Sequence, residues 1–134
     1  MKLRFESDGL ESLIGDLEKN KNLLDEAAPE MLKAGAEVII DCWKDAIRAH
    51  DLIDTGDMLN SVKAFYVISP NSKYADIYPD GIDCKGVRNG EKAFINHYGA
   101  TNRKATHFVS DAETKAEEPA VNAMAEIWYS KLEG

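Results

Sequence analysis

The stretch PEMLKAGAEVIIDCWKDAIRAH, residues 29–50, has the clearest periodicity in the chain. Its apolar residues recur every three or four positions and charged residues fill the positions between them, which is typical of an amphipathic helix with one buried face. Pro29 suits the first turn of such a helix, since a proline there gives up an N–H that has no partner in any case. We therefore predict a helix from about Pro29 to His50, whose buried stripe consists of Leu32, Ala36, Ile39, Trp43, Ala46 and Ile47.

Two elements are expected before this helix. Residues 1–6 alternate Leu3 and Phe5 with charged residues, which is the period of two of a short strand or an extended arm. Asp8 followed by Glu11 resembles a capping box, and leucine and isoleucine then recur at helical spacing. The pattern predicts a first helix over about residues 8–25.

The residues after the long helix predict a short helix and then a hairpin. Thr55 is placed as the N-cap of a helix through residues 57–61. The segments AFYVIS at 64–69 and YADIY at 74–78 are rich in aromatic and β-branched residues and flank a turn, so they favour an antiparallel hairpin. The loop PDGIDCKGVRNG at 79–90 carries three glycines, and we expect its tip to be mobile.

The last third of the chain predicts a third strand and a final helix. The strand is AFINHY at 93–98, ended by Gly99, and Ser110 with Glu113 forms a capping box for the helix. Pro119 must kink that helix or begin a second one. The predicted class is α+β, with long N-terminal helices, a small antiparallel sheet of a hairpin plus a third strand, and a C-terminal helix. The apolar face of the final helix is Val109, Ala112, Ala116, Ala120, Ala123 and Ile127.

The composition indicates one globular domain over residues 1–134. With 44% hydrophobic and 30% charged residues, the disordered, collagen-like and coiled-coil classes are excluded. No apolar run approaches the ~20 residues that span a bilayer and no signal-peptide pattern is present, so we expect a soluble, unsecreted protein without a membrane partner. Cys42 and Cys84 lie far apart with no metal-ligand spacing, which fits a reduced cytoplasmic setting.

The charge is acidic overall but uneven along the chain. A formal net charge of −8 has the wrong sign for wrapping nucleic acid, so no specific nucleic-acid binding is predicted. Residues 85–104 carry a net +4, which leaves −12 on the remainder. Such an asymmetry favours a protein contact or a solvated loop over a nucleic-acid site. The candidate interface residues are Lys85, Arg88, Lys92, Arg103 and Lys104.

The sequence contains no motif of catalysis or cofactor binding. His50, His97 and His107 lack metal-ligand spacing, no serine stands in GxSxG, and the glycines form no phosphate-binding loop. We therefore predict a protein that is not an enzyme, with no catalytic residue, metal or cofactor. The enzyme alternative is a metal-dependent hydrolase or nuclease, which would require Asp54, Asp57 and His97 to converge.

Three segments, in this order, are similar to segments of one known family. The first is the long helix followed by a turn of the pattern TG-x-L-x-x-S-[IV], carried here by Thr55, Gly56, Leu59 and Ser61, with Met58 adding one position. The hairpin separates this turn from the second segment.

The second and third segments flank residues 100–104, a short loop that contains the basic residues Arg103 and Lys104. NHYG at 96–99 is similar to the family's E-[FY]-G, with Tyr98 and Gly99 in place and His97 standing for Glu. ATHFVSDA at 105–112 is similar to its HPF-x-x-x-A entry into the C-terminal helix, with Phe108 in place. Over about residues 30–130 the chain therefore resembles the gene-product-ten-like family of siphophage tail components.

The resemblance implies a structural subunit of a phage or prophage. It implies a head–tail joining or tail-completion protein that forms a six-fold ring at the capsid–tail interface during virion assembly, and that is found in the host cytoplasm until then. The implied partners are further copies of the chain and the neighbouring head-closure, tail-terminator or tail-tube proteins, with DNA passing through the ring. A host-encoded protein-binding module of similar fold is the other alternative. In either case an unpaired edge of the small sheet is a natural place to add a neighbour's strand.

Overall fold

The computed structural model describes residues 3–4, 21–53 and 56–133. The class is α+β, as predicted. Most of the helix expected over residues 8–25 falls outside the described residues. The elements in chain order are β1 (Leu3–Arg4), α2 (Lys21–Ala49), α3 (Asp57–Asn60), β2 (Val62–Ile68), β3 (Lys73–Pro79), α4 (Asn89–Tyr98) and α5 (Phe108–Glu133).

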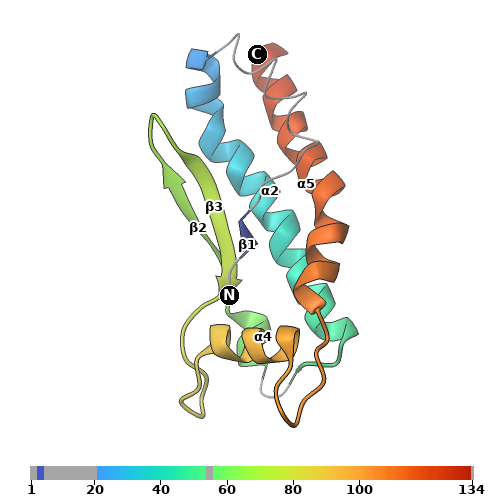
Figure 1. The fold of residues 1–134 in the computed structure, drawn as a ribbon. Coiled ribbons are helices and arrows are strands. Elements are labelled where there is room, and N and C mark those ends of the chain that lie inside the picture. The colour runs from blue at the N-terminus through green and yellow to red at the C-terminus, as the bar shows by residue number, and fades with distance from the viewer. Residues whose placement is uncertain (1–2, 5–20, 54–55, 134) are drawn as a thin grey trace.

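The two long helices α2 and α5 lie side by side, and the small sheet lies along α2 (Figure 1). All six residues of the stripe predicted for α2 are buried. Trp43 packs edge-on against Phe108 of α5, with ring centroids 5.6 Å apart. A Cβ added at Gly35 would come within 2.8 Å of Met124 Sδ, so this glycine lets the helices approach closely. On α5 the buried face is Phe108, Val109, Ala112, Ala116, Ala120, Met124 and Trp128.

That face differs from the predicted one in its second half. Ala123 and Ile127 are only partly buried, and Met124 and Trp128 take the core positions instead. The reason is that the contact with α2 continues along a spacing of four residues from Ala112 onward, whereas the prediction shifted by one position.

The prediction that Pro29 lies in the first turn of its helix was wrong, and Pro119 does not begin a second helix, because each proline lies inside a continuous helix. Pro29 is the ninth residue of α2, and α5 runs through Pro119 to Glu133. Each proline is on the exposed side, where the carbonyl that loses its N–H partner can be solvated. On the opposite face of α2, Ala27, Ala28 and Met31 are buried, and this packing outweighs the loss of the backbone hydrogen bond that Pro29 cannot donate.

The predicted caps of α3 and α5 were also wrong. The N-cap of α3 is Gly56, in the left-handed conformation with φ 87°, and Thr55 lies outside the described residues. Helix α5 begins at Phe108, so Ser110 and Glu113 are inside it rather than forming its capping box. Its first N–H groups are bonded instead by Thr106 Oγ1 and His97 Nδ1, at 3.4 and 3.3 Å.

The sheet has three antiparallel strands in the order β1-β3-β2. The predicted hairpin is confirmed, with Ala64 opposite Ile77 and Ile68 opposite Lys73. The predicted strand over residues 93–98 was wrong, because these residues belong to helix α4. Its buried residues, Asn89, Ala93, Asn96 and His97, share one helical face. The third strand is instead β1, which confirms the period-two reading at Leu3–Arg4.

Among the helices that the structure describes, none is both long and apolar enough to cross a membrane.

Candidate assembly surfaces

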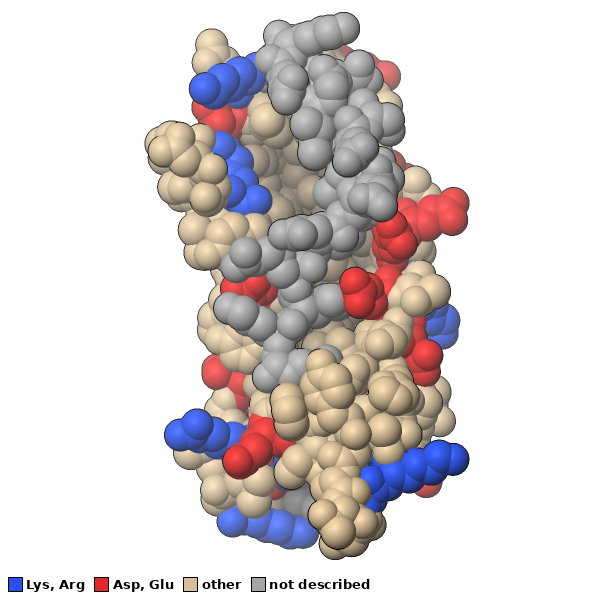
Figure 2. Space-filling view, viewed as in Figure 1, with Lys and Arg blue, Asp and Glu red and all other residues tan. Residues whose placement is uncertain are grey.

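Helices α3 and α4 and two loops, residues 80–88 and 99–107, form one end of the molecule, which we call the α4 end (Figure 1). It contains all five candidate basic residues and, of the residues that carry the family resemblance, Leu59, Tyr98 and Gly99, whereas Gly56, Ser61 and Phe108 directly adjoin it. Lys and Arg side chains gather at this end in Figure 2, and Asp and Glu are more frequent higher up on the same face.

Asp83 organises the first of these loops. Its buried carboxylate accepts the N–H groups of Lys85 and Val87 at 2.9 and 2.8 Å and pairs with the Lys92 ammonium. Hydrogen bonding from Lys92, followed by that from Val87, lowers the pKa of Asp83. Lys92 therefore holds α4 against the loop, and Asp83 joins residues 85 and 87 of the loop to each other.

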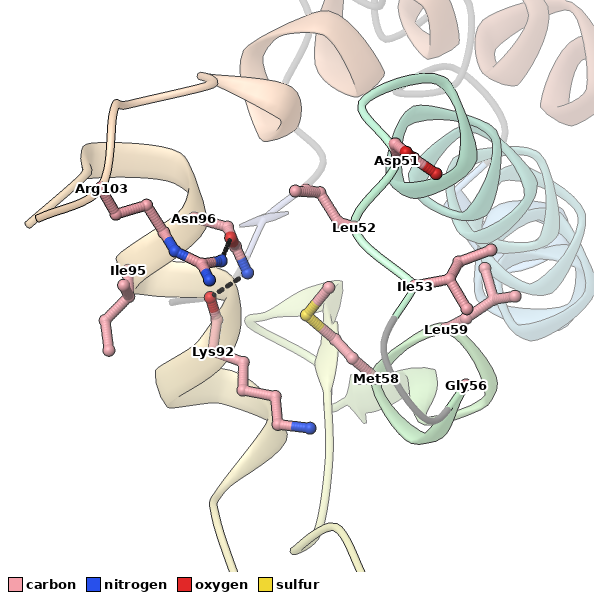
Figure 3. Close-up of a pocket in the computed structure, with 10 residues that line it drawn as sticks. All are labelled: Asp51, Leu52, Ile53, Gly56, Met58, Leu59, Lys92, Ile95, Asn96 and Arg103. Atoms are coloured by element: carbon pink, nitrogen blue, oxygen red, sulfur yellow. Dashed lines mark hydrogen bonds between the residues drawn. The ribbon is translucent and has the colours of Figure 1, made fainter. Parts of the chain in front are cut away.

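Arg103 is also held within the subunit. Its guanidinium donates to the Asn96 side-chain oxygen (Figure 3), and the Asn96 amide donates to Lys92 O at 2.9 Å. The backbone oxygen of Asn96 accepts Thr106 Oγ1 at 2.7 Å. Asn96 thus ties the second loop to α4. Of the predicted interface residues, Lys85, Arg88, Arg103 and Lys104 are exposed and Lys92 is half-buried, and Lys92 and Arg103 also support the fold.

A pocket of about 450 Å³ lies between α4 and the turn before α3 (Figure 3). Lys92 and Arg103 come from one side, and Asp51 comes from the end of α2 on the other. Leu52, Ile53, Leu59 and Ile95 make much of the remaining wall apolar. Since Lys92 is paired with Asp83 and Asp51 lines the opposite side, the pocket offers a partly apolar recess rather than a strong anion site.

The motif residues have structural roles at this end. Gly99 ends α4 with φ 85°, and a Cβ there would lie 2.8 Å from Ala105 N and 2.9 Å from Arg103 O. Ser61 Oγ donates to Met58 O at 2.8 Å, Leu59 packs against the core, and Phe108 is fully buried. Tyr98 is the exception, because its side chain is 56% exposed.

The histidines and the residues of the enzyme alternative are used in separate structural contacts. His50 Nε2 lies 2.5 Å from Asp111 Oδ2 and joins α2 to α5. His97 is buried beneath α5, and burial is the main cause that lowers its pKa. Asp57 accepts Cys84 N at 3.0 Å, and Asp54 lies outside the described residues. Within the described part of the chain no three His, Cys, Asp or Glu residues are arranged to hold a metal ion.

The two cysteines differ in environment. Cys42 is partly buried against the core, and burial raises the pKa of its thiol, so it is a packing residue as the sequence indicates. Cys84 is exposed in the loop that Asp83 organises.

The tip of the hairpin is a surface that the sequence analysis missed. Strand β2 is an edge of the sheet, and it exposes Phe65, Tyr66, Val67 and Ile68 in succession. Successive residues of a strand point to opposite faces, so both faces of the tip are apolar. The available signal was the run AFYVISPNS at 64–72, which contains no charged residue.

The comparisons identify no relative: no family model matches the chain, and neither a curated protein nor a solved structure does so.

Proposed function

We propose that this chain is a structural subunit of a phage or prophage, a head–tail joining or tail-completion protein that assembles into a ring at the capsid–tail junction. The observation that carries the proposal is the exposed apolar edge strand, residues 65–68 of β2. Large exposed apolar side chains on an edge strand are a liability in a protein that stays alone, and are typical of one that adds a partner at that edge.

The resemblance described above supplies the particular assembly. Its residues gather at the α4 end, and Gly56 and Gly99 both have φ values that favour glycine. These features support a shared local structure around α3 and α4. They are the reason for preferring a phage connector to an unspecified binding module.

The charge distribution is compatible with a conduit for DNA. The chain is acidic overall, so the lining of a ring made from its acidic surface would repel the phosphate backbone and let DNA pass without binding. In this proposal the subunit is not an enzyme and needs no cofactor. Its partners are five further copies and the adjoining head-closure, tail-terminator or tail-tube proteins, and it resides in the host cytoplasm until it enters the virion.

The gene's neighbourhood gives the first test. A connector gene is expected among portal, capsid and tail-tube genes. A position among host genes instead would favour the host-encoded protein-binding module, for which the same exposed strand would also serve.

Deletion of the gene from an inducible prophage gives the functional test. We expect DNA-filled heads and tails to accumulate separately in electron micrographs, and a plasmid copy of the gene to restore joined particles. Joined, infective particles at the undeleted yield would contradict the proposed function.

A further inference from the structure

We propose that His97 is an acid-sensitive latch between helices α4 and α5. While its imidazole is neutral, it holds the last turn of α4 and the loop of residues 99–107 against the start of α5. Protonation of the imidazole releases this turn and loop, whereas α5 stays packed on α2. The latch goes beyond the proposed function and does not depend on it.

Backbone N–H groups near the start of α5 bond to the last turn of α4. Thr106 N donates to Asn96 O at 3.0 Å, and His107 N donates to His97 O at 3.1 Å. Val109 N, inside α5, donates to His97 Nδ1 at 3.3 Å. His97 therefore contributes both its backbone oxygen and a ring nitrogen to the connection.

The bond from Val109 requires a neutral ring. Because Nδ1 accepts a hydrogen bond, the neutral imidazole carries its proton on Nε2. A second proton must then bind Nδ1, where it would turn an N–H donor toward the N–H of Val109. The ring also lies against the N-terminus of α5, whose partial positive charge disfavours a cation. Protonation therefore replaces an attractive contact by a repulsive one.

Aromatic side chains surround the ring of His97, which is only 5% exposed. Tyr98 and Phe108 meet this ring edge-on, with ring centroids 4.5 and 6.2 Å from its own. Burial among these rings removes the water that would hydrate an imidazolium, and it is the largest cause that lowers the pKa of His97.

The charged groups that act on His97 come from the loop, from α5 and, indirectly, from α2. The ring of His107 lies edge-on to it, with centroids 5.2 Å apart, and also lowers the pKa of His97. Asp111 of α5 acts in the opposite direction. Its carboxylate is also bonded by His50 from the end of α2, at 2.5 Å. Asp111 therefore compensates a charge on His97 only in part.

The contacts that hold the start of α5 on α2 do not involve His97. Trp43 packs against Phe108, and His50 pairs with Asp111. An imidazolium at His97 breaks neither contact. The separation is therefore expected between α4 and α5, and not between the two long helices.

The loop of residues 99–107 can separate without uncovering much of the core. Residues 101–104 are exposed. His107 has a left-handed φ of 54°, which is uncommon for a residue other than glycine, and release lets it leave this conformation. Because the loop carries Arg103 and Lys104, acidification would change the mobility of two of the candidate basic residues.

The sign of the pH dependence follows from the lowered pKa of His97. When the turn and loop separate, the ring regains solvent and titrates near the ordinary histidine pKa of ~6.5. The released form then binds a proton more tightly than the latched form, so acid favours release. The released fraction is lowest above about pH 6.5. Below that value it rises by at most about tenfold for each pH unit, which is the limit for one proton.

Amide hydrogen exchange measured by NMR between pH 7.5 and pH 5 tests the latch in the wild type. Each exchange rate is divided by the intrinsic rate for that residue and pH, which gives an opening constant. We expect the opening constants of Thr106, His107 and Val109 to rise several-fold below about pH 6.5. At every pH they should exceed those of the most protected α2 amides, which report global unfolding.

Two variants assign the effect to one histidine. His97→Gln does not titrate and still offers an oxygen to Val109 N, so its opening constants should change less than twofold over the same pH range. His50→Gln is the matched control, because it removes a histidine that bonds to α5 but not to α4. It should keep the wild-type rise. Far-ultraviolet circular dichroism establishes that both variants are folded.

The wild-type measurement is decisive even if a variant does not fold. Opening constants that stay level between pH 7.5 and pH 5, or amides that open only together with those of α2, would overturn the latch. An equal rise in His97→Gln, or its loss in His50→Gln, would do so as well, because the proton would then act at another residue.

Discussion

Trp43 is the residue on which most of the hydrophobic core between α2, α5 and the sheet depends. It is fully buried and meets Phe108 across the α2–α5 contact. Its indole Nε1 has no hydrogen-bond partner within the described part of the chain, so packing alone holds the side chain in place. Shape rather than polarity should therefore determine which substitutions this position tolerates.

Replacement of Trp43 by alanine should lower the free energy of unfolding by about 3–5 kcal/mol, because it removes a large buried side chain and leaves a cavity. Trp43→Phe is the matched variant, since it keeps an aromatic ring against Phe108 and removes an unpaired N–H. It should lose less than half as much. Urea titrations of the three proteins measure both differences, and a loss below about 1 kcal/mol for Trp43→Ala would contradict the central position given to this residue.

His97 gives the chain a pH dependence whose sign can be stated. Burial lowers its pKa, neighbouring His107 adds to that effect, and Asp111 opposes it. The unfolded chain, with a histidine pKa near ~6.5, then binds more protons than the folded chain in mildly acidic solution. The stability that neutral His97 contributes is complete above about pH 6.5 and is lost as the pH falls toward the folded-state pKa.

We expect the Tm of the wild type to fall between about pH 7.5 and pH 5, and that of His97→Gln to fall less. Glutamine does not titrate and can still offer an oxygen to the N–H of Val109, which His97 Nδ1 accepts at 3.3 Å. The two proteins share every other residue, so the comparison isolates the contribution of His97. Parallel Tm curves for the two proteins would refute this role of His97.

At the scale of elements, α4 depends on its connections more than on its own sequence. It is short, and two of its four buried residues are the polar Asn96 and His97, which bond the loop and the start of α5. Gly99 makes these connections possible, because the chain reverses there and the backbone of Ala105 and Arg103 passes close by.

Alanine at Gly99 should destabilise the protein more than alanine at Gly86. Both glycines have positive φ, 85° and 82°, so both variants carry backbone strain. Gly99 adds two further costs, since its ψ of 177° lies in a region essentially restricted to glycine and its Cβ would meet backbone atoms, whereas nothing lies within 4 Å of a Cβ at Gly86. Thermal unfolding of the two variants measures the difference, and equal losses would show that the two loops do not pack as described.

At the scale of the whole molecule, the uneven charge survives in the fold, although an acidic residue compensates one of its cations. Lys92 pairs with Asp83, which lies just outside the +4 segment. Arg103 donates to the uncharged Asn96 and keeps its charge, so the surface contribution rests mainly on Lys85, Arg88, Arg103 and Lys104, which are all exposed.

Reversal of Arg88 and Lys104 to glutamate should weaken self-association at low salt. Exposed ion pairs contribute only about 0.2–1 kcal/mol each, so the effect should be several-fold and should shrink as salt shortens the Debye length toward ~3 Å near 1 M. Sedimentation velocity at low and high salt measures it. Reversal of Lys33 and Lys115, which are exposed elsewhere on α2 and α5, is the matched control, and an equal effect there would indicate general charge rather than a contact at the α4 end.

The sequence by itself determined the α+β class, the buried face of α2 and the hairpin. Each of these follows from a repeat of apolar residues long enough to be read without knowing what it packs against. Leu32 to Ile47 is such a repeat, and all six predicted residues are buried.

Tertiary structure alone decided the elements and site residues that depend on a partner distant in sequence. AFINHY reads as a strand, yet it is helical because Ala93, Asn96 and His97 share one buried face. The five candidate basic residues form one patch in the sequence, yet the ion pair with Asp83 compensates the charge of Lys92 in the folded chain. The hairpin tip stays exposed because α2 covers it only in part, although Lys73 pairs with Asp25 of that helix. In each case local propensity is weak, and the energy of burial and pairing, which depends on distant residues, determines the outcome.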